Sequence, residues 1–324
     1  MFSREFAMGR ILVCVISLHL LVGCSSSEPK SGSGNPPAPI APTVQVPAQV
    51  AKSAGPELDF PSQRKAFKTQ LTKKGPSPQR YNPKLKLPEG VKEVVYTSGE
   101  LKLKAYYALP EEASATKKVP VFVYYHGGFA FGAGDLDDAV PAFQAGFAVL
   151  MPTLRGENGN PGFHELYFGE LDDARAALEW IKTQPELDAA HVYTFGHSAG
   201  GVLSALLALY PDTPARITGS AGGLYDEKLF DADDPFDITR PEECRLRVMS
   251  PNAQLLKLPH YGYVGTEDQW VVNGARTAKR QSDLTHSPLK IYFVKGDHHG
   301  SLEGAMEMYL KVISEDAFKG AEKK

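Results

Sequence analysis

The chain has 324 residues, 42% of them hydrophobic, and its 35 basic and 38 acidic residues leave a formal net charge of −3. This length accommodates one α/β domain of ordinary size plus a tail, with enough apolar residues for a hydrophobic core. The slightly negative charge argues against nucleic-acid binding.

The first residues have the pattern of an export signal. Arg4 and Arg10 give a positively charged start, and the apolar segment 11–22 is shorter than the about 20 residues that a membrane-spanning helix needs. Cys24 follows it after a small residue. The arrangement resembles a bacterial lipoprotein signal peptide over residues 1–23, in which Cys24 becomes the lipidated N-terminus. An ordinary secretory peptide with an incidental cysteine is the alternative.

This resemblance implies an exported, membrane-anchored protein that faces the periplasm or the cell surface, with the lipid bilayer as a partner. Of the three cysteines, Cys14 is then lost with the signal peptide and Cys24 carries the lipid. Cys244 remains alone, so we expect no internal disulfide.

Residues 24–60 hold the lipidated cysteine and a linker rich in Ser, Gly, Pro and Ala, which we expect to be a disordered, partly extended spacer. Residues 61–324 then form the catalytic domain. Its first part, residues 61–90, is basic. We expect a solvated helix and loop that cover the sheet edge, and contact with anionic lipid head groups is the alternative.

The remainder alternates apolar runs of strand length with segments of helical periodicity. Segments 94–97 and 101–108 are separated by a short turn with Gly99, which predicts an antiparallel hairpin. The further apolar runs that we predict as strands are residues 119–125, 147–151, 191–195, 260–264 and 289–294. This order predicts an α/β fold: a mostly parallel central sheet with helices on both faces and an antiparallel N-terminal edge.

Two glycine-rich turns follow predicted strands. His126-Gly127-Gly128-Phe129 comes after the strand 119–125, and its glycines leave backbone N–H groups open to a negatively charged oxygen. Gly196-His197-Ser198-Ala199-Gly200 lies between a strand and the apolar segment 202–209, the strand–turn–helix context of a nucleophile elbow. We expect one oxyanion donor from Gly128 or Phe129 and the other from Ala199. A plain glycine-rich turn is the alternative for the first motif.

Two further segments lie near these turns. Residues 155–162 follow a strand end, where α/β sheets place their ligands, and we expect Arg155 and Glu157 to pair and brace the loop. Segment 224–243 is acidic, and we expect a lid whose charges face water.

These motifs, followed by Gly265-Thr266-Glu267-Asp268 and Gly296-Asp297-His298-His299, resemble the α/β-hydrolases of the prolyl oligopeptidase-like kind from Val91 to the C-terminus. The resemblance implies a catalytic Ser, Asp and His in that chain order, with Ser198 as the nucleophile. It implies neither a cofactor nor a metal.

The acid and the base each have two candidates. The family spacing favours Asp268, because Gly265 and Val271 stand three residues before and after it; Glu267 is the alternative. The family spacing likewise favours His298, with His299 as the alternative base.

The two resemblances together imply a membrane-tethered serine hydrolase, prolyl oligopeptidase-like, that cleaves a peptide or ester bond through an acyl-enzyme intermediate. Its substrate is a peptide or a small molecule. A carboxylesterase of small acyl esters is equally compatible with such a site, because the fold does not select the substrate. A non-catalytic tethered binding module with a hydrolase fold is the third possibility.

Overall fold

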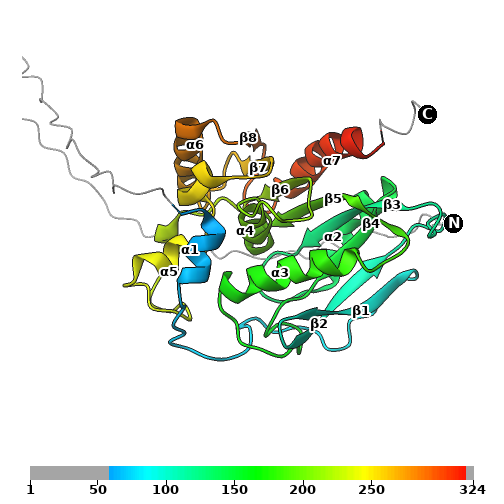
Figure 1. The fold of residues 1–324 in the computed structure, drawn as a ribbon, viewed down its shortest axis with the longest axis horizontal. Helices are drawn as coiled ribbons and strands as arrows, with labels where there is room; N and C mark the ends of the chain where they lie inside the picture. The colour runs from blue at the N-terminus through cyan, green and yellow to red at the C-terminus, as the bar shows by residue number, and fades with distance from the viewer. Residues whose placement is uncertain (1–57, 319–324) are drawn as a thin grey trace, which may run out of the picture. The chain divides into compact units, whose positions relative to one another are not determined.

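The computed structural model describes residues 58–318, which contain one eight-stranded sheet in the order β1-β2-β4-β3-β5-β6-β7-β8 (Figure 1). The strands are Val91–Ser98 (β1), Leu101–Ala108 (β2), Val119–Tyr125 (β3), Ala148–Pro152 (β4), Leu187–His197 (β5), Ile217–Ala221 (β6), His260–Gly265 (β7) and Leu289–Val294 (β8). The predicted signal peptide, Cys24 and nearly all of the predicted linker lie outside the described residues.

The strand directions confirm the predicted fold class. β1 and β2 form an antiparallel hairpin, β2 pairs antiparallel with β4, and β3 to β8 run parallel to one another. Parallel strands bring their carboxyl ends to one edge of the sheet, so the loops that follow β3, β5, β6, β7 and β8 gather there. The site described below lies at this edge.

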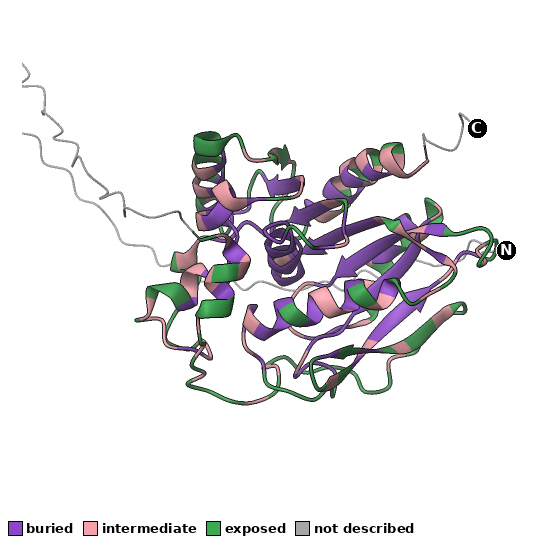
Figure 2. Cartoon of the chain, in the orientation of Figure 1, coloured by how far each residue is buried: buried purple, intermediate pink, exposed green. Residues whose placement is uncertain are grey.

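Helices cover both faces of the sheet. The longer helices are Ala133–Gln144 (α2), Phe168–Ile181 (α3), Ser198–Leu207 (α4), Val272–Thr285 (α6) and Leu302–Phe318 (α7). Alternate residues of β3 enter two separate cores: Val121, Val123 and Tyr125 belong to the core that also contains residues of α3, α4 and α6, whereas Phe122 and Tyr124 belong to the core that contains residues of α2 and α7. Buried residues accordingly follow the central strands and the inner faces of the helices, whereas the edge strands β1 and β8 are largely exposed or half-buried (Figure 2).

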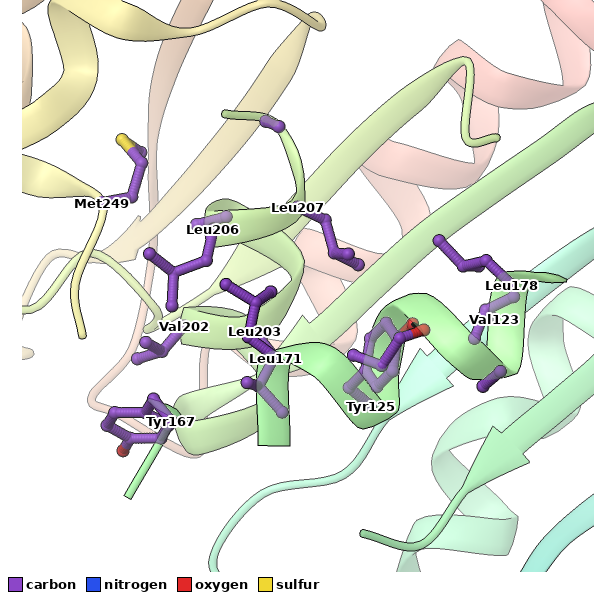
Figure 3. Close-up of a cluster of buried hydrophobic side chains, with 14 of the residues drawn as sticks. Val123, Tyr125, Tyr167, Leu171, Leu178, Val202, Leu203, Leu206, Leu207 and Met249 are labelled. Carbon is purple, nitrogen blue, oxygen red and sulfur yellow. Dashed lines mark hydrogen bonds between the residues drawn. The ribbon is translucent and has the colours of Figure 1, made fainter. Parts of the chain in front are cut away.

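Helix α4 is buried along its length from Ala199 to Leu207. Its side chains Val202, Leu203 and Leu206 belong to the same core cluster as Leu171 of α3 and Tyr125 of β3 (Figure 3). A helix that is apolar on nearly all sides is stable only inside a protein, which explains the apolar sequence of α4. The burial fixes the N-terminal end of α4, where Ser198 lies.

The helix of the N-terminal basic segment does not cover the sheet edge as expected. Helix α1 (Phe60–Ala66) instead lies beside the short helix α5 (Pro241–Arg245), where the Arg245 guanidinium donates to Gln63 Oε1 (Figure 1). Phe60 is fully buried against Tyr210, with the ring centroids 5.8 Å apart.

The acidic segment 224–243 departs from the prediction at one carboxylate, whereas Asp231, Asp233 and Glu242 are exposed as expected. Glu243 is fully buried, and its carboxylate accepts hydrogen bonds from Arg247, Thr69 Oγ1 and the Gln70 amide. Thr69 and Gln70 of the N-terminal segment therefore help to bury the Glu243 carboxylate, which does not face water as expected. Within the described residues, no helix is both long and apolar enough to cross a membrane.

Candidate active site

Ser198 lies at the sharp turn between β5 and α4 and has a left-handed φ of 52°. Such a conformation costs a non-glycine residue about 1–2 kcal/mol. Two glycines make the turn possible: a Cβ on Gly196 would collide with the backbone of Gly200, and a Cβ on Gly200 would collide with the carbonyl of Tyr125. The close packing of strand, turn and helix is therefore the reason for the glycines around the serine.

Ser198, His298 and Asp268 form one chain of hydrogen bonds. His298 Nε2 lies 2.8 Å from Ser198 Oγ, and His298 Nδ1 lies 2.7 Å from Asp268 Oδ2. Asp268 follows β7 and His298 follows β8, so neighbouring parallel strands deliver both side chains to the same edge. Asp268 and His298 are buried, whereas Glu267 and His299 are exposed and make neither contact.

The hydrogen bonds define where the protons lie. The Asp268 carboxylate can only accept, so His298 donates through Nδ1–H. The neutral ring then has its lone pair on Nε2, which accepts the hydrogen of Ser198 Oγ–H. This arrangement places a base within reach of the serine proton, with a carboxylate that holds the ring and stabilises its protonated form.

Tyr225 is part of the site and was missed by the sequence analysis. Its hydroxyl lies 2.9 Å from Ser198 Oγ and 3.5 Å from His298 Nε2. Because the serine hydrogen is used by His298, the Tyr225 hydroxyl donates to Ser198 Oγ. Burial raises the pKa of Tyr225, while the hydrogen bond to Ser198 opposes the rise, so the hydroxyl keeps its proton at neutral pH. The one sequence signal for this residue is its place after Gly222 and Gly223, just beyond the carboxyl end of β6.

The amides predicted as oxyanion donors differ in their hydrogen-bond partners. The Ala199 amide belongs to the first turn of α4, whose N–H groups have no partner inside the helix. The Phe129 N–H instead donates to the side-chain oxygen of Gln79, at 2.8 Å. Gly128, at φ 67°, leaves room for this contact, since a Cβ there would lie 2.6 Å from the same oxygen. Any other oxygen that uses the Phe129 amide must first displace Gln79.

Gln79 is held over the site by the segment around it. The Ser77 amide donates to the carbonyl of Gly156 at 3.0 Å, the Ser77 hydroxyl donates to the carbonyl of Phe129, and the His164 amide donates to the carbonyl of Gly75 at 2.9 Å. We call residues 75–79 the strap. A cavity of about 360 Å³ lies beside the strap. It is lined by the strap, by Phe129, by residues of the segment that follows α1, and by residues at the end of η1 (Glu227–Leu229) and just after it.

The prediction that Arg155 pairs with Glu157 is wrong. Arg155 binds Asp173 and Glu165, each at 2.8 Å. Glu157 points toward the interior, where its carboxylate accepts from the Leu154 amide at 2.9 Å and lies 3.1 Å from His126 Nε2. The two charges therefore brace different parts of the loop, because each finds an oppositely charged partner from another element.

The His126–Glu157 pair supports the loop that carries Gly128. Both side chains are almost completely buried. Burial alone lowers the pKa of His126, but the Glu157 carboxylate outweighs it and raises this pKa to about 9. His126 is therefore protonated at neutral pH and forms a buried ion pair at the start of the loop.

His197, the residue before the serine, joins two loops of the site. Burial lowers the pKa of His197 to about 4, so its ring is neutral and has a single N–H at neutral pH. Its Nε2 lies 2.8 Å from the carbonyl oxygen of His298, to which it donates that hydrogen. The elbow and the loop after β8 are thus tied together through a contact that involves neither Ser198 Oγ nor the His298 ring.

Comparison with known proteins places this geometry in context. Residues 94–227 match the family described as X-Pro dipeptidyl-peptidase (S15 family). The chain is 23% identical to the uncharacterized peptidase YtmA of Bacillus subtilis over 215 residues, which are 62% of this chain and 82% of that protein. It is 32% identical to the uncharacterized protein Rv2307c of Mycobacterium tuberculosis over 134 residues, 41% of this chain but only 46% of that protein.

Several solved structures have a similar fold. Dipeptidyl peptidase 4 of Porphyromonas gingivalis has a TM-score of 0.57 and 17% identity, over 72% of this chain but 35% of that one. A puromycin-hydrolyzing peptidase of Mycobacterium tuberculosis has a TM-score of 0.58 and 19% identity, over 71% and 41%. The acetyl xylan esterase of Paenibacillus sp. R4 has a TM-score of 0.55 and 17% identity, over 78% and 92%.

The sheet order and the structural likeness define an α/β-hydrolase fold. Together with the family match and the hydrogen-bonded Ser–His–Asp geometry, they identify the chain as a serine hydrolase.

Proposed function

We propose that this hydrolase cleaves a peptide or ester bond through an acyl-enzyme formed on Ser198. The observation that carries the proposal is the continuous chain of hydrogen bonds from Ser198 through His298 to Asp268. The same arrangement of nucleophile, base and orienting carboxylate performs acyl transfer on unrelated folds.

In the first half-reaction, His298 Nε2 takes the proton of Ser198 as Oγ bonds to the substrate carbonyl carbon. The carbonyl oxygen gains negative charge, and the Ala199 amide, with an amide of the Gly128–Phe129 turn, supplies its hydrogen bonds. His298 then gives the proton to the leaving group, and the bond to that group breaks. In the second half-reaction, His298 takes a proton from water as the water oxygen bonds to the acyl carbon. The bond from that carbon to Ser198 Oγ then breaks, and His298 returns the proton to Oγ, which releases the acid and restores Ser198.

The family match and the likeness to peptidases support a peptide bond as the substrate. A carboxylesterase of small acyl esters is the second candidate. It is favoured by the likeness to the acetyl xylan esterase, which spans 92% of that chain, whereas this chain covers only 35% of the dipeptidyl peptidase.

We also propose that Cys24 anchors the enzyme to a membrane outside the cytoplasm. The proposal depends on the sequence of residues 1–24 alone. Its test is metabolic labelling with a radioactive fatty acid in a bacterial host. We expect label in the wild-type chain and none in Cys24→Ser, and equal labelling of both would refute the anchor.

The first experiment for the catalytic proposal is reaction of the full chain with a fluorophosphonate probe, which modifies only an activated serine. We expect labelling of the wild type and of His299→Ala, and loss of labelling in Ser198→Ala and His298→Ala. Labelling that depends on His299 instead would reassign the base. A folded wild type that remains unlabelled would reject the hydrolase mechanism and favour a binding module with this fold.

A further inference from the structure

A groove of about 500 Å³ opens on the surface between the segment after β6 and helix α6. Its lining includes Asp226, Lys228, Trp270, Asn273, Arg276 and Arg280. We call it the α6 groove. Its tryptophan and its arginines have no role in the mechanism proposed above.

Trp270 connects the α6 groove to the candidate active site. Its ring centroid lies 4.8 Å from that of His298, and its backbone N–H donates to Asp268 Oδ1 at 3.1 Å. Nevertheless 60% of Trp270 is exposed, so a flat apolar surface faces the groove. A leaving group must take its proton from His298, so it departs beside the Trp270 ring that packs against His298. The groove therefore extends from the leaving-group side of the site.

The charge of the α6 groove is predominantly positive. Lys228, Arg276 and Arg280 line it together with a single carboxylate, Asp226. Within residues 58–318, none of these three cations lies within 4.0 Å of a carboxylate oxygen. The Asp226 carboxylate accepts a hydrogen bond from Thr277 Oγ1 at 3.1 Å.

The positions on α6 explain why the charges face one way. Arg276 and Arg280 are four residues apart, so they lie on the same side of the helix. Asn273 belongs to the first turn, where the helix dipole adds partial positive charge. The groove thus offers two guanidinium groups, an ammonium and an aromatic surface at one end of the site, and these groups complement a carboxylate.

We infer that the α6 groove binds a carboxylate on the leaving group, as in a short peptide with a free C-terminus or an ester of a carboxylate-bearing alcohol or phenol. The inference rests on the proposed function and names the substrate class of the same site. Trp270 contacts the body of the leaving group, and Arg276 and Arg280 contact its carboxylate.

The test compares two acetate esters that differ in the charge of the leaving group, 4-acetoxybenzoate and its neutral analogue 4-acetoxybenzamide. In the variants Arg276→Gln and Arg280→Gln we expect kcat/KM for the benzoate to fall about threefold each, and for the benzamide to stay unchanged. Added salt should reduce the wild-type preference for the benzoate, because exposed charges are screened. The matched control is Lys279→Gln, an exposed cation of the same helix that pairs with Asp283 outside the groove.

Equal effects of the arginine variants on both esters, or no effect on either, would overturn the inference. Failure of the proposed function is distinguishable, because the wild type would then not react with the fluorophosphonate. If the wild type reacts with the probe but cleaves neither ester, protection from labelling replaces turnover. The inference is supported if 4-acetoxybenzoate protects Ser198 from labelling better than 4-acetoxybenzamide does, and if this advantage is lost in the arginine variants. Equal protection by the two esters contradicts it.

Discussion

At the scale of single residues, the site combines side chains that belong to recognisable motifs with one that does not. Ser198, Asp268 and His298 stand in patterns that the sequence displays, but Tyr225 is brought to the serine only by the turn after β6. A tyrosine near two glycines has many structural explanations, and it contacts a serine that lies 27 residues earlier in the sequence. Such a contact emerges from tertiary structure and leaves no local periodicity.

The variant Tyr225→Phe tests the role of that hydroxyl. We expect the second-order rate of fluorophosphonate labelling to fall about fivefold, the equivalent of about 1 kcal/mol for one hydrogen bond. The hydroxyl holds Ser198 Oγ in place and stabilises the negative charge that gathers on Oγ as its proton passes to His298. The matched control is Tyr292→Phe on the edge strand β8. An unchanged rate in Tyr225→Phe would show that the hydroxyl only fills space.

The His126–Glu157 pair predicts a pH dependence of stability. The pKa of His126 is raised to about 9 in the folded state, against a usual value of 6.5, so the folded protein holds a proton that the unfolded chain releases between these values. The free energy of unfolding should therefore be highest below pH 6.5 for this pair and decrease by about 1–3 kcal/mol as the pH rises to 9.

Urea unfolding of the wild type and of His126→Gln at pH 6.5 and pH 9 measures this dependence. The decrease should be present in the wild type and absent or smaller in the variant. The lowered pKa values of His197 and His260 act in the opposite direction, mainly below pH 6.5, and equally in both proteins, so they do not affect the comparison. Identical decreases in both proteins would contradict the assignment of the proton to His126.

At the scale of elements, strands with a simple apolar pattern were predicted well and a polar strand was missed. β3 and β8 have the predicted bounds, because each is an apolar run that ends at a turn. β6, with the sequence Ile-Thr-Gly-Ser-Ala, has no such run. Its buried hydroxyls are satisfied by one side chain of β7: His260 lies 2.8 Å from Thr218 Oγ1 and 2.9 Å from Ser220 Oγ. Only the neighbouring strand makes this polar segment a stable part of the sheet.

The strap yields a prediction at the same scale. Because Gln79 accepts the hydrogen bond of the Phe129 amide, the variant Gln79→Ala should free this donor and raise the labelling rate about threefold, the effect of removing a competing hydrogen bond of modest net strength. Gln184→Ala is the control, since Gln184 is bonded to the adjacent Thr183. A slower rate in Gln79→Ala would mean that Gln79 shapes the turn for catalysis and does not obstruct it.

At the scale of the whole molecule, the segment that forms helix α1 is an integral part of the fold. Helix α1 begins at Phe60, one residue before the predicted start of the catalytic domain, and Phe60 belongs to the large core cluster. A composition rich in Pro and Ser up to residue 56 conceals this boundary, because one apolar residue gives no periodic signal.

Replacement of Phe60 measures how much that segment contributes. Phe60→Ala removes a fully buried ring and should lower the free energy of unfolding by about 3–4 kcal/mol, through lost burial and the cavity that remains. Leu58→Ala is the matched control, because Leu58 is 57% exposed and should change stability by less than about 0.5 kcal/mol. Chemical denaturation of both variants decides the point, and a small effect at Phe60 would mean that α1 is dispensable for the core.

The hydrogen bond from His197 to the backbone of His298 has a practical consequence. Because it joins the two loops without using either reacting atom, the variant Ser198→Ala should keep the shape of the site while losing turnover. Such a variant is a trap: incubated with an extract of small molecules and peptides, it would retain its own uncleaved substrate. Mass spectrometry of what it releases could then identify the natural substrate directly.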